Sequence, residues 1–349
     1  MTKKIDLIVK NGLYVTHKKT IKGDIAVHKG KIYRVGNISD LKSSKTIDAK
    51  GLHILPGAID TQVHFREPGN TDKEDLKSGS RAAVAGGITT VFDMPNNNPS
   101  MSTKTLFKKK LNGAKNRMFC NYAFYFGAEK NNTNEIKKME KEVGCCGIKV
   151  FVGVSTGTLI VSDYKDIKRI MKSTKKMISF HSEDQYELNK REKFIKRGDP
   201  KSHPKWRNES VCLICTKNLV KLANQTKKKI HILHITTAEE IELLNKNKKY
   251  VSYEVTPQHL VLSSPSCYDK LGTLTQMNPP IRSLRHNKRL RQALKNNEID
   301  IVGSDHAPHK LSEKKLEYPD SPSGMPGVQT LLPILLNEVS KKMISINNV

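Results

Sequence analysis

Residues 59–69 read IDTQVHFREPG, a stretch that begins with the apolar character of a buried strand. It ends in a group of side chains that bind metals and anions. Because alternate residues of a strand point to the same face, Gln62 and His64 are expected to lie side by side. An H-x-H metal pair is built in this way, except that the first position here is glutamine. The stretch therefore predicts a strand leading into a metal site with one weakened ligand, or into the remains of such a site.

The same pattern recurs from residue 57 onward, where apolar runs alternate with polar stretches of helical character. The eight runs are AIDTQVHF, ITTVFDM, NYAFYFG, GIKVFV, MISFHSE, IHILHIT, YVSYEVT and IDIVGSDH. An α/β chain of eight strands, with a helix between most pairs, is typical of a (β/α)8 TIM barrel. A barrel gathers the carboxyl ends of its strands on one face, so residues far apart in the sequence converge on one pocket. The polar residues at these strand ends are His64, Asn96, Lys149, His181, His234, Glu254 and Asp305.

The N-terminal residues follow a different pattern. Segments such as IDLIVKNGLYVT and DIAVHKGKIYRVG alternate apolar and polar residues and are broken by turns that contain glycine. We expect residues 1–55 to form a small β-sandwich-like domain and residues 56–349 to form the barrel. After the eighth strand come a loop rich in Gly and Pro and one further helix.

Composition narrows the class of function. The chain has 349 residues and a formal net charge of +27, with its lysines scattered rather than gathered into a basic stripe. This favours small anionic substrates over nucleic acid. No apolar run could span a bilayer and no signal-peptide pattern is present, so we expect a cytoplasmic protein without a membrane partner. Six cysteines suit a reducing compartment. Cys212 and Cys215 form a C-x-x-C within a helical pattern, where we expect them to pack in the core.

Several strand-end residues have the chemistry of a hydrolytic site. Lys149 lies inside the apolar run GIKVFV, where a buried ammonium is costly. It could reach the surface, pair with a carboxylate, or react with carbon dioxide to give an anion that bridges two metal ions. Asp305 could both hold a metal and pass protons. Together with His64, His181 and His234, these oxygen and nitrogen ligands on one barrel rim predict a zinc-type site.

A second set of residues suits a substrate better than a metal. Arg66 lies on the same strand face as His64, and its planar donors suit a carboxylate. Asn96 in MPNNNP and Asn278 in QMNPPIR are amides that could bind substrate or could serve turn chemistry alone.

Taken together, the ordered motifs resemble the amidohydrolase superfamily and, within it, dihydroorotases of the type related to allantoinase and hydantoinase. The resemblance covers nearly the whole chain. It rests on HFREPG, EDLKSGSRAAVAGGITTVFDMPNNNP, GIKVFVG, FHSED, LHITTAEE, YEVTPQHL, MNPPIR, GSDHAPH and SGMPGVQT.

Position by position, the resemblance implies a set of metal ligands: His64, carbamylated Lys149, His181, His234 and Asp305. It further implies residues that bind the substrate carboxylate, namely Arg66, Asn96 and His309. Residues implied to contact the substrate ring are Asn278, Ser323 and Gly324.

The implied reaction is the reversible opening of the cyclic amide of (S)-dihydroorotate to N-carbamoyl-L-aspartate, a step of de novo pyrimidine biosynthesis. A metal-bound hydroxide would attack the ring carbonyl carbon, with Asp305 as general acid and base. Allantoinase-like sequences tend to have Asn where this chain has Arg66, and a ring carboxylate fits arginine better.

Two features depart from the family pattern. The family usually has His at the position of Gln62, and an amide oxygen is a poorer zinc ligand than imidazole. Of one or two zinc ions, we expect the ion on Lys149, His181 and His234 to be kept and the ion near Gln62 to be weak or absent. Family members also usually continue with strands that complete the N-terminal β unit, and we expect these strands to be lacking here.

Two other functions remain open. One is a hydrolase for a related cyclic amide such as a hydantoin or allantoin, and the other is a non-catalytic relative that scaffolds aspartate transcarbamoylase. Replacement of one histidine alone in the ligand set argues against the non-catalytic alternative. The expected partners are the small-molecule substrate, further copies of the chain in a homodimer or homotetramer, and aspartate transcarbamoylase.

Overall fold

The computed structural model describes residues 5–155 and 159–349. The chain divides into two compact units: Met1–Ala58 with Leu336–Val349, and Ile59–Leu335. The first boundary lies close to the expected one between residues 55 and 56. The C-terminal residues group with the N-terminal unit, whereas the sequence pattern assigns them to the barrel. One contact that joins them is the hydrogen bond from Asn347 Nδ2 to the Thr16 carbonyl oxygen, 2.7 Å long.

The N-terminal unit contains a five-stranded mixed sheet in the order β3-β2-β1-β4, with β5 pairing to β1. Strands β1, β2 and β3 are antiparallel, while β4 and β5 run parallel to β1. Its core consists of Ile5, Ile8, Ala26 and Ile38, with Leu41 packed against it. The strands are β1 (Leu7–Val15), β2 (Thr20–His28), β3 (Lys31–Gly36), β4 (Thr46–Asp48) and β5 (His53–Ile54).

The second unit is built on eight parallel strands that form a nearly closed barrel, as the sequence predicts. They are β6 (Ala58–Val63), β7 (Ile88–Asp93), β8 (Asn121–Gly127), β9 (Cys145–Phe151), β10 (Ile178–His181), β11 (Ile230–Ile232), β12 (Val251–Val255) and β13 (Ile301–Val302). The first and last strands meet just beyond their ends, where the His64 amide donates to the His306 carbonyl oxygen over 2.7 Å. Continuous burial along β9 and β10 explains their apolar sequences, because barrel strands are covered on both faces.

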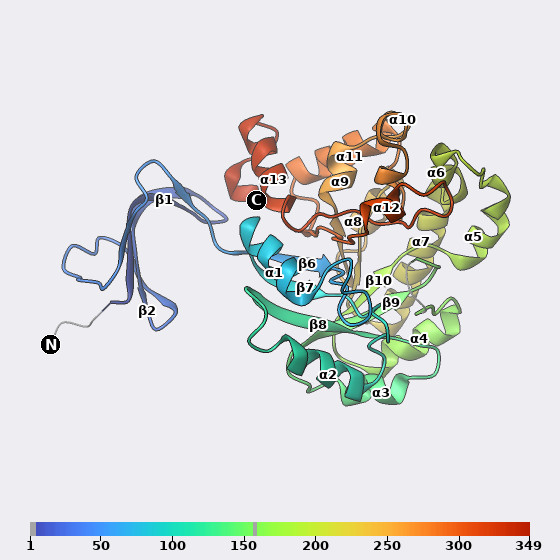
Figure 1. Cartoon of the computed structure of the whole chain (residues 1–349), viewed down its shortest axis with the longest axis horizontal. Helices are drawn as coiled ribbons and strands as arrows, with labels where there is room; N and C mark the ends of the chain where they lie inside the picture. Colours follow the sequence, from blue (N-terminus) through green and yellow to red (C-terminus); the bar gives the residue numbers. More distant parts are fainter. Residues whose placement is uncertain (1–4, 156–158) are drawn as a thin grey trace. The chain divides into compact units, whose positions relative to one another are not determined.

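Helices follow most of the strands (Figure 1). Side-chain caps start several of them: Asp75 accepts from the Ser78 amide at α1, and Thr237 accepts from the Glu240 amide at α8. Cys212 and Cys215 are buried in α7, as expected for core packing. The helices are α1 (Leu76–Ala85), α2 (Lys104–Ala114), α3 (Thr133–Lys138), α4 (Tyr164–Ser173), α5 (Gln185–Arg191), α6 (His203–Trp206), α7 (Glu209–Thr226), α8 (Ala238–Asn245), α9 (Pro257–Val261), α10 (Ser266–Leu271), α11 (Leu284–Lys295), α12 (Leu311–Lys314) and α13 (Leu331–Ser340).

Short 3-10 helices complete the chain: η1 (Glu192–Phe194), η2 (Pro200–Ser202), η3 (Gly272–Thr275) and η4 (Ile346–Asn348). Across the described ranges, no helix combines the length and the apolar character needed to cross a membrane.

Candidate active site

The expected metal ligands converge at the carboxyl ends of the barrel strands. They line one small cavity of about 20 Å3, the inner cavity. Its lining residues are Gln62, His64, Lys149, Phe151, Ser155, His181, His234, Asn278, Asp305, Ala307, Ser323 and Gly324. Residues separated by more than 200 positions in the sequence therefore share one site, as a barrel requires.

Lys149 on β9 is fully buried at the centre of this set. Within the described ranges its Nζ has no hydrogen-bond partner, and it lies 4.4 Å from the centre of the Phe151 ring. Burial lowers the pKa of this amine to about 7, although Asp305 and Glu254 act in the opposite direction. The lysine thus neither reaches the surface nor forms an ion pair with a described carboxylate, and a large fraction of it is a neutral amine at pH 7.

Two imidazoles face each other next to Lys149. His181 Nδ1 lies 3.0 Å from His234 Nε2, while His181 Nε2 lies 2.8 Å from Glu183 Oε2. Glu183 is ion-paired with Arg207, and although its burial acts to raise its pKa, Arg207 and His181 bring that pKa down to about 2. The carboxylate therefore accepts a hydrogen bond from the His181 Nε2–H and leaves the Nδ1 lone pair directed at His234. Such an outer carboxylate is how metal-binding imidazoles are commonly oriented.

On the other side of the cavity, the Asp305 carboxylate contacts two neighbouring side chains. Its Oδ1 accepts from Gln62 Nε2 over 2.8 Å and lies 3.1 Å from His64 Nε2. His64 Nδ1 lies 2.7 Å from the side-chain oxygen of Asn96. If His64 donates to Asn96, its Nε2 faces Asp305 with a lone pair unless the ring is protonated. A proton or a cation between the two groups relieves this repulsion.

The backbone is strained at two of these residues. His234 and Asp305 have φ values of 40° and 47°, in the left-handed region that favours glycine. Such strain costs roughly 1–3 kcal/mol per residue and clusters at functional sites, where it aims a side chain.

A second cavity of about 660 Å3, the outer pocket, is lined by Arg66, Asn96 and His309 together with Lys73 and other polar residues. Arg66 Nε donates to the Pro308 carbonyl oxygen over 2.9 Å, and Arg66 Nη2 lies 3.2 Å from His309 Nε2. Burial, together with the neighbouring cations Arg66 and Lys73, lowers the pKa of His309 to about 3. Arg66 and Lys73 thus bring positive charge to the pocket, although Lys73 is ion-paired with Glu313 and Glu129 also lines the pocket, while His309 stays neutral.

Two contacts join residues that line the two cavities. The His64–Asn96 contact joins them on one side, and His309 Nε2 lies 3.1 Å from the Ser323 carbonyl oxygen on the other. Gly324 has φ 140°, and a side chain there would collide with the Ala307 carbonyl oxygen at 2.6 Å. Asn278 lines the inner cavity, where its Oδ1 is 3.0 Å from His203 Nε2.

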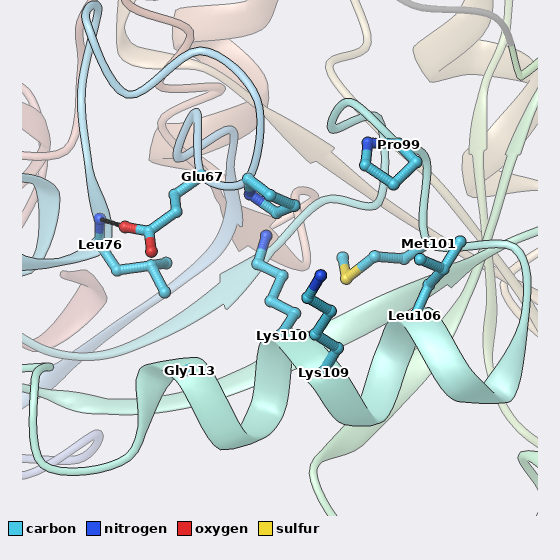
Figure 2. A pocket seen from close by; sticks show the side chains of 9 residues that line it. Glu67, Leu76, Pro99, Met101, Leu106, Lys109, Lys110 and Gly113 are labelled. Carbon is cyan, nitrogen blue, oxygen red and sulfur yellow. Dashed lines mark hydrogen bonds between the residues drawn. The ribbon is translucent and has the colours of Figure 1, made fainter.

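Another, mainly apolar cavity of about 190 Å3 (Figure 2) shares Pro99 and Leu106 with the lining of the outer pocket. In it, Glu67 accepts a hydrogen bond from the Leu76 amide over 3.1 Å. The buried Lys110 of α2 donates to Asp93 over 2.5 Å and to Asn97 over 2.8 Å. These contacts anchor the loop after β7, which presents Asn96 to the outer pocket.

The sequence analysis did not identify the residues that orient the side chains of the two polar cavities. Glu183 lies two positions after His181 in FHSED, so period-two spacing could have indicated it. No such signal marks Arg207, Lys73 or His203, since only folding brings them to the site. In the described part of the chain, no three His, Cys, Asp or Glu side chains form a cluster that could hold a metal by themselves. The imidazole pair and the His64–Asp305 pair instead line the cavity together with Lys149.

The barrel and its rim of converging polar groups define a protein of the (β/α)8-barrel hydrolase class. Residues 53–336 match the amidohydrolase family, and the chain belongs to that family. Similar curated proteins are named dihydroorotase. That of Methanosarcina acetivorans is 33% identical over 98% of this chain and 76% of its own length, and that of Pyrococcus horikoshii is 35% identical over 98% and 74%.

Among solved structures, the L-hydantoinase (dihydropyrimidinase) of Arthrobacter aurescens superimposes with a TM-score of 0.94 at 26% identity, covering 99% of this chain and 79% of that one. A D-hydantoinase crystal structure gives a TM-score of 0.87 at 26% identity, covering 98% and 78%. The family, the fold and the hydrolase class inferred from the sequence are thereby confirmed.

Proposed function

We propose that this chain is a dihydroorotase, which reversibly hydrolyses the ring amide of (S)-dihydroorotate to N-carbamoyl-L-aspartate. The observation that carries the proposal is the pair of contacts that joins a cavity of metal-ligand chemistry to a pocket lined by Arg66. The first suits amide hydrolysis, and the second suits a substrate that carries a carboxylate beside its ring. The names of the curated relatives support the same assignment.

The inner cavity fits a divalent cation. Its buried Lys149 Nζ has no partner within the described ranges, and Glu183 holds the His181 lone pair toward His234. We assign zinc to Lys149 in carboxylated form, His181 and His234, with His64 and Asp305 as ligands of any second ion. When bound, a divalent cation polarises the amide carbonyl and lowers the pKa of water, which is the chemistry the reaction needs.

Carboxylation of Lys149 follows from its environment. With its pKa lowered to about 7 by burial, the neutral amine has a lone pair that can attack carbon dioxide. A C–N bond forms, one C=O π bond of carbon dioxide breaks, and one proton leaves the nitrogen, so the neutral amine becomes an anionic carbamate. This change gives a buried amine without a partner the oxygen ligands that the His and Asp residues alone do not supply.

Substrate orientation belongs to the outer pocket. Arg66 is held by the Pro308 carbonyl through Nε, which leaves its terminal nitrogens for a carboxylate. Asn278, Ser323 and Gly324 line the inner cavity where the ring would lie. Gly324 lets the chain pass close to His309 without a side chain in the way.

Asp305 moves the proton. Its side chain, 10% exposed, accepts a hydrogen bond from Gln62, which fixes the direction of the carboxylate. In hydrolysis it takes a proton from the attacking water and passes it to the ring nitrogen as the amide bond breaks; in the reverse direction it removes that proton.

The test is a cyclisation assay with N-carbamoyl-L-aspartate on the purified chain, accompanied by metal analysis. The expected result is formation of dihydroorotate, with turnover of hydantoin and allantoin at least about a hundredfold lower in kcat/KM. Preferential turnover of hydantoin or allantoin would instead support a hydrolase for a related cyclic amide. The similarity to hydantoinase structures is the observation that favours this alternative. Absence of turnover and of metal would support the scaffold alternative.

The variant Arg66→Gln tests whether Arg66 binds the substrate carboxylate. We expect KM for dihydroorotate to rise about tenfold or more, because a charge-assisted contact to its carboxylate is lost. Arg81→Gln, on the exposed side of α1, is the matched control and should leave KM unchanged.

The remaining expectations stay predictions. They are a cytoplasmic location, a role in pyrimidine biosynthesis, a homodimer or homotetramer, and an association with aspartate transcarbamoylase. Size-exclusion chromatography with light scattering, with and without aspartate transcarbamoylase, measures the last two.

A further inference from the structure

Two rim segments that carry substrate-pocket residues are joined by charge pairs. Lys73 follows β6, and its Nζ lies 2.9 Å from Glu313 Oε1 in α12. The same Nζ lies 3.3 Å from His309 Nδ1, and Glu313 Oε2 lies 3.7 Å from that nitrogen. Lys73, His309 and Glu313 thus form a three-residue cluster at the outer pocket, the rim clasp.

The clasp selects one tautomer of His309. If Nε2 carries the proton, it donates to the Ser323 carbonyl oxygen at 3.1 Å, and Nδ1 accepts from Lys73. If Nδ1 carries the proton, it faces the Lys73 ammonium, and Nε2 faces the carbonyl oxygen with a lone pair. The first arrangement gives each ring nitrogen a partner, Lys73 at Nδ1 and Ser323 at Nε2. The second sets an N–H against the Lys73 ammonium at Nδ1 and leaves Arg66 Nη2 as the donor to Nε2. The Nε2–H form is therefore favoured.

This tautomer has a consequence for Arg66. Its Nη2 lies 3.2 Å from His309 Nε2, which is already a donor to Ser323 and so offers no lone pair. Arg66 Nη2 therefore has no acceptor in the imidazole and is left to donate to a carboxylate bound in the outer pocket. In the other tautomer, Nε2 would accept from Nη2 and draw the guanidinium away from a bound carboxylate.

We propose that Lys73 is a positioning residue, held by Glu313, that fixes the tautomer of His309 and so keeps the Arg66 guanidinium directed at the substrate carboxylate. The proposal rests on the proposed function for the identity of that carboxylate. Lys73 acts here through His309 and does not itself bind the substrate. Because the charges of the clasp belong to two separate segments, exchanging them keeps the attraction, and a lysine at position 313 could donate to His309 Nδ1.

The experiment compares Lys73→Met, the exchange variant Lys73→Glu/Glu313→Lys, and the wild-type chain. Lys73→Met should raise KM for dihydroorotate about tenfold with little change in kcat, because substrate orientation and not proton transfer is affected. The exchange variant should recover most of this loss. If Lys73 bound the carboxylate directly, the glutamate at position 73 would repel it and KM would rise further, which overturns the proposal.

The matched control is the neighbouring pair of Asp72 and Lys310, which joins the same two segments with a 2.5 Å contact. Both side chains are exposed, and their ion pair does not include the His309 imidazole, so Asp72→Asn and Lys310→Met should leave KM within about twofold of the wild-type value. A rise in KM equal to that of Lys73→Met would show that any link between the segments suffices, and would overturn the specific role of Lys73.

A second measurement does not depend on turnover. Nitrogen-15 NMR of the imidazoles, with His309 assigned through His309→Gln, should show a protonated Nε2 in the wild-type and exchange chains. In Lys73→Met the signal should move toward a mixture of tautomers. A wild-type chain with this spectrum but no activity on dihydroorotate would refute the proposed function and leave the clasp intact. An unchanged tautomer in Lys73→Met would refute the clasp.

Discussion

The two sides of the inner cavity hold their ligands differently. On the β10 and β11 side, Glu183 occupies one nitrogen of His181 and leaves the other directed at His234. On the β6 and β13 side, the Asp305 carboxylate is already in contact with both Gln62 and His64. On the first side, a carboxylate outside the cavity orients the nitrogen atoms that could bind a metal. On the second side, the polar groups of Asp305, Gln62 and His64 already contact one another.

The difference shows what one substitution in an H-x-H pair does. An imidazole at position 62 would present a lone pair to a cation, whereas the amide of Gln62 donates a hydrogen to Asp305 and so takes up one of that carboxylate's acceptor positions. The glutamine thus supplies, without a metal, a positive partner for Asp305. We expect a metal site of high affinity beside His181 and His234 and one of low affinity beside Gln62. Lys149 would be a ligand in both sites.

Removing Lys149, the residue that both sides share, should lower the activity more than any other change. Lys149→Ala is expected to lower kcat/KM about a thousandfold, because both sides lose their common ligand. Lys77→Ala, an exposed lysine on α1, is the control and should keep full activity. Activity of Lys149→Ala near the wild-type level, in metal-loaded protein, would contradict the role of the lysine.

The second test concerns stability and pH in metal-free protein without bicarbonate. The pKa of Lys149 is about 7 in the folded chain against 10.5 for an ordinary lysine, so the unfolded chain binds more protons between these values. Stability of the wild-type chain should therefore rise with pH across that window. Lys149→Met should stabilise the chain by about 2–4 kcal/mol below pH 7, with the gain vanishing near pH 10.5. Urea unfolding at several pH values measures this, and a gain independent of pH would exclude the titration of Lys149 as its cause.

The two sides can be separated by comparing His234→Ala with His64→Ala. The first variant should weaken zinc binding at least about tenfold more than the second, since it removes a ligand on the oriented side. Competition with a chromophoric chelator gives the dissociation constants, with His53→Ala in the N-terminal unit as the control. Equal losses would mean that the two sides bind metal alike.

The smallest change in activity is expected from Gln62→His. This variant should raise the zinc content per chain above that of the wild type, while activity changes only a fewfold, because the ion on the other side can already serve hydrolysis. Gln185→His, a polar position at the start of α5 and outside the inner cavity, is the control. A zinc content no higher than the wild-type value would refute the interpretation of Gln62 as a weakened ligand.

Much of the fold followed from local pattern. The eight apolar runs, from AIDTQVHF to IDIVGSDH, predict the eight barrel strands because a strand buried on both faces must be apolar along its length. The convergence of His64, Lys149, His181, His234 and Asp305 also followed, since parallel strands end on one face. The grouping of the C-terminal residues with the N-terminal unit did not follow, because it depends on contacts between distant segments.

By itself, the sequence determined the barrel, the order of its strands and the polar groups at their ends, because period and polarity are local properties of the chain. Only the tertiary structure decided which nitrogen of His181 faces His234, that Asn96 contacts His64, and that Lys73 reaches His309. The physical reason is that hydrogen-bond direction and a buried amine's pKa are set by neighbours that folding brings together, and no spacing along the chain records them.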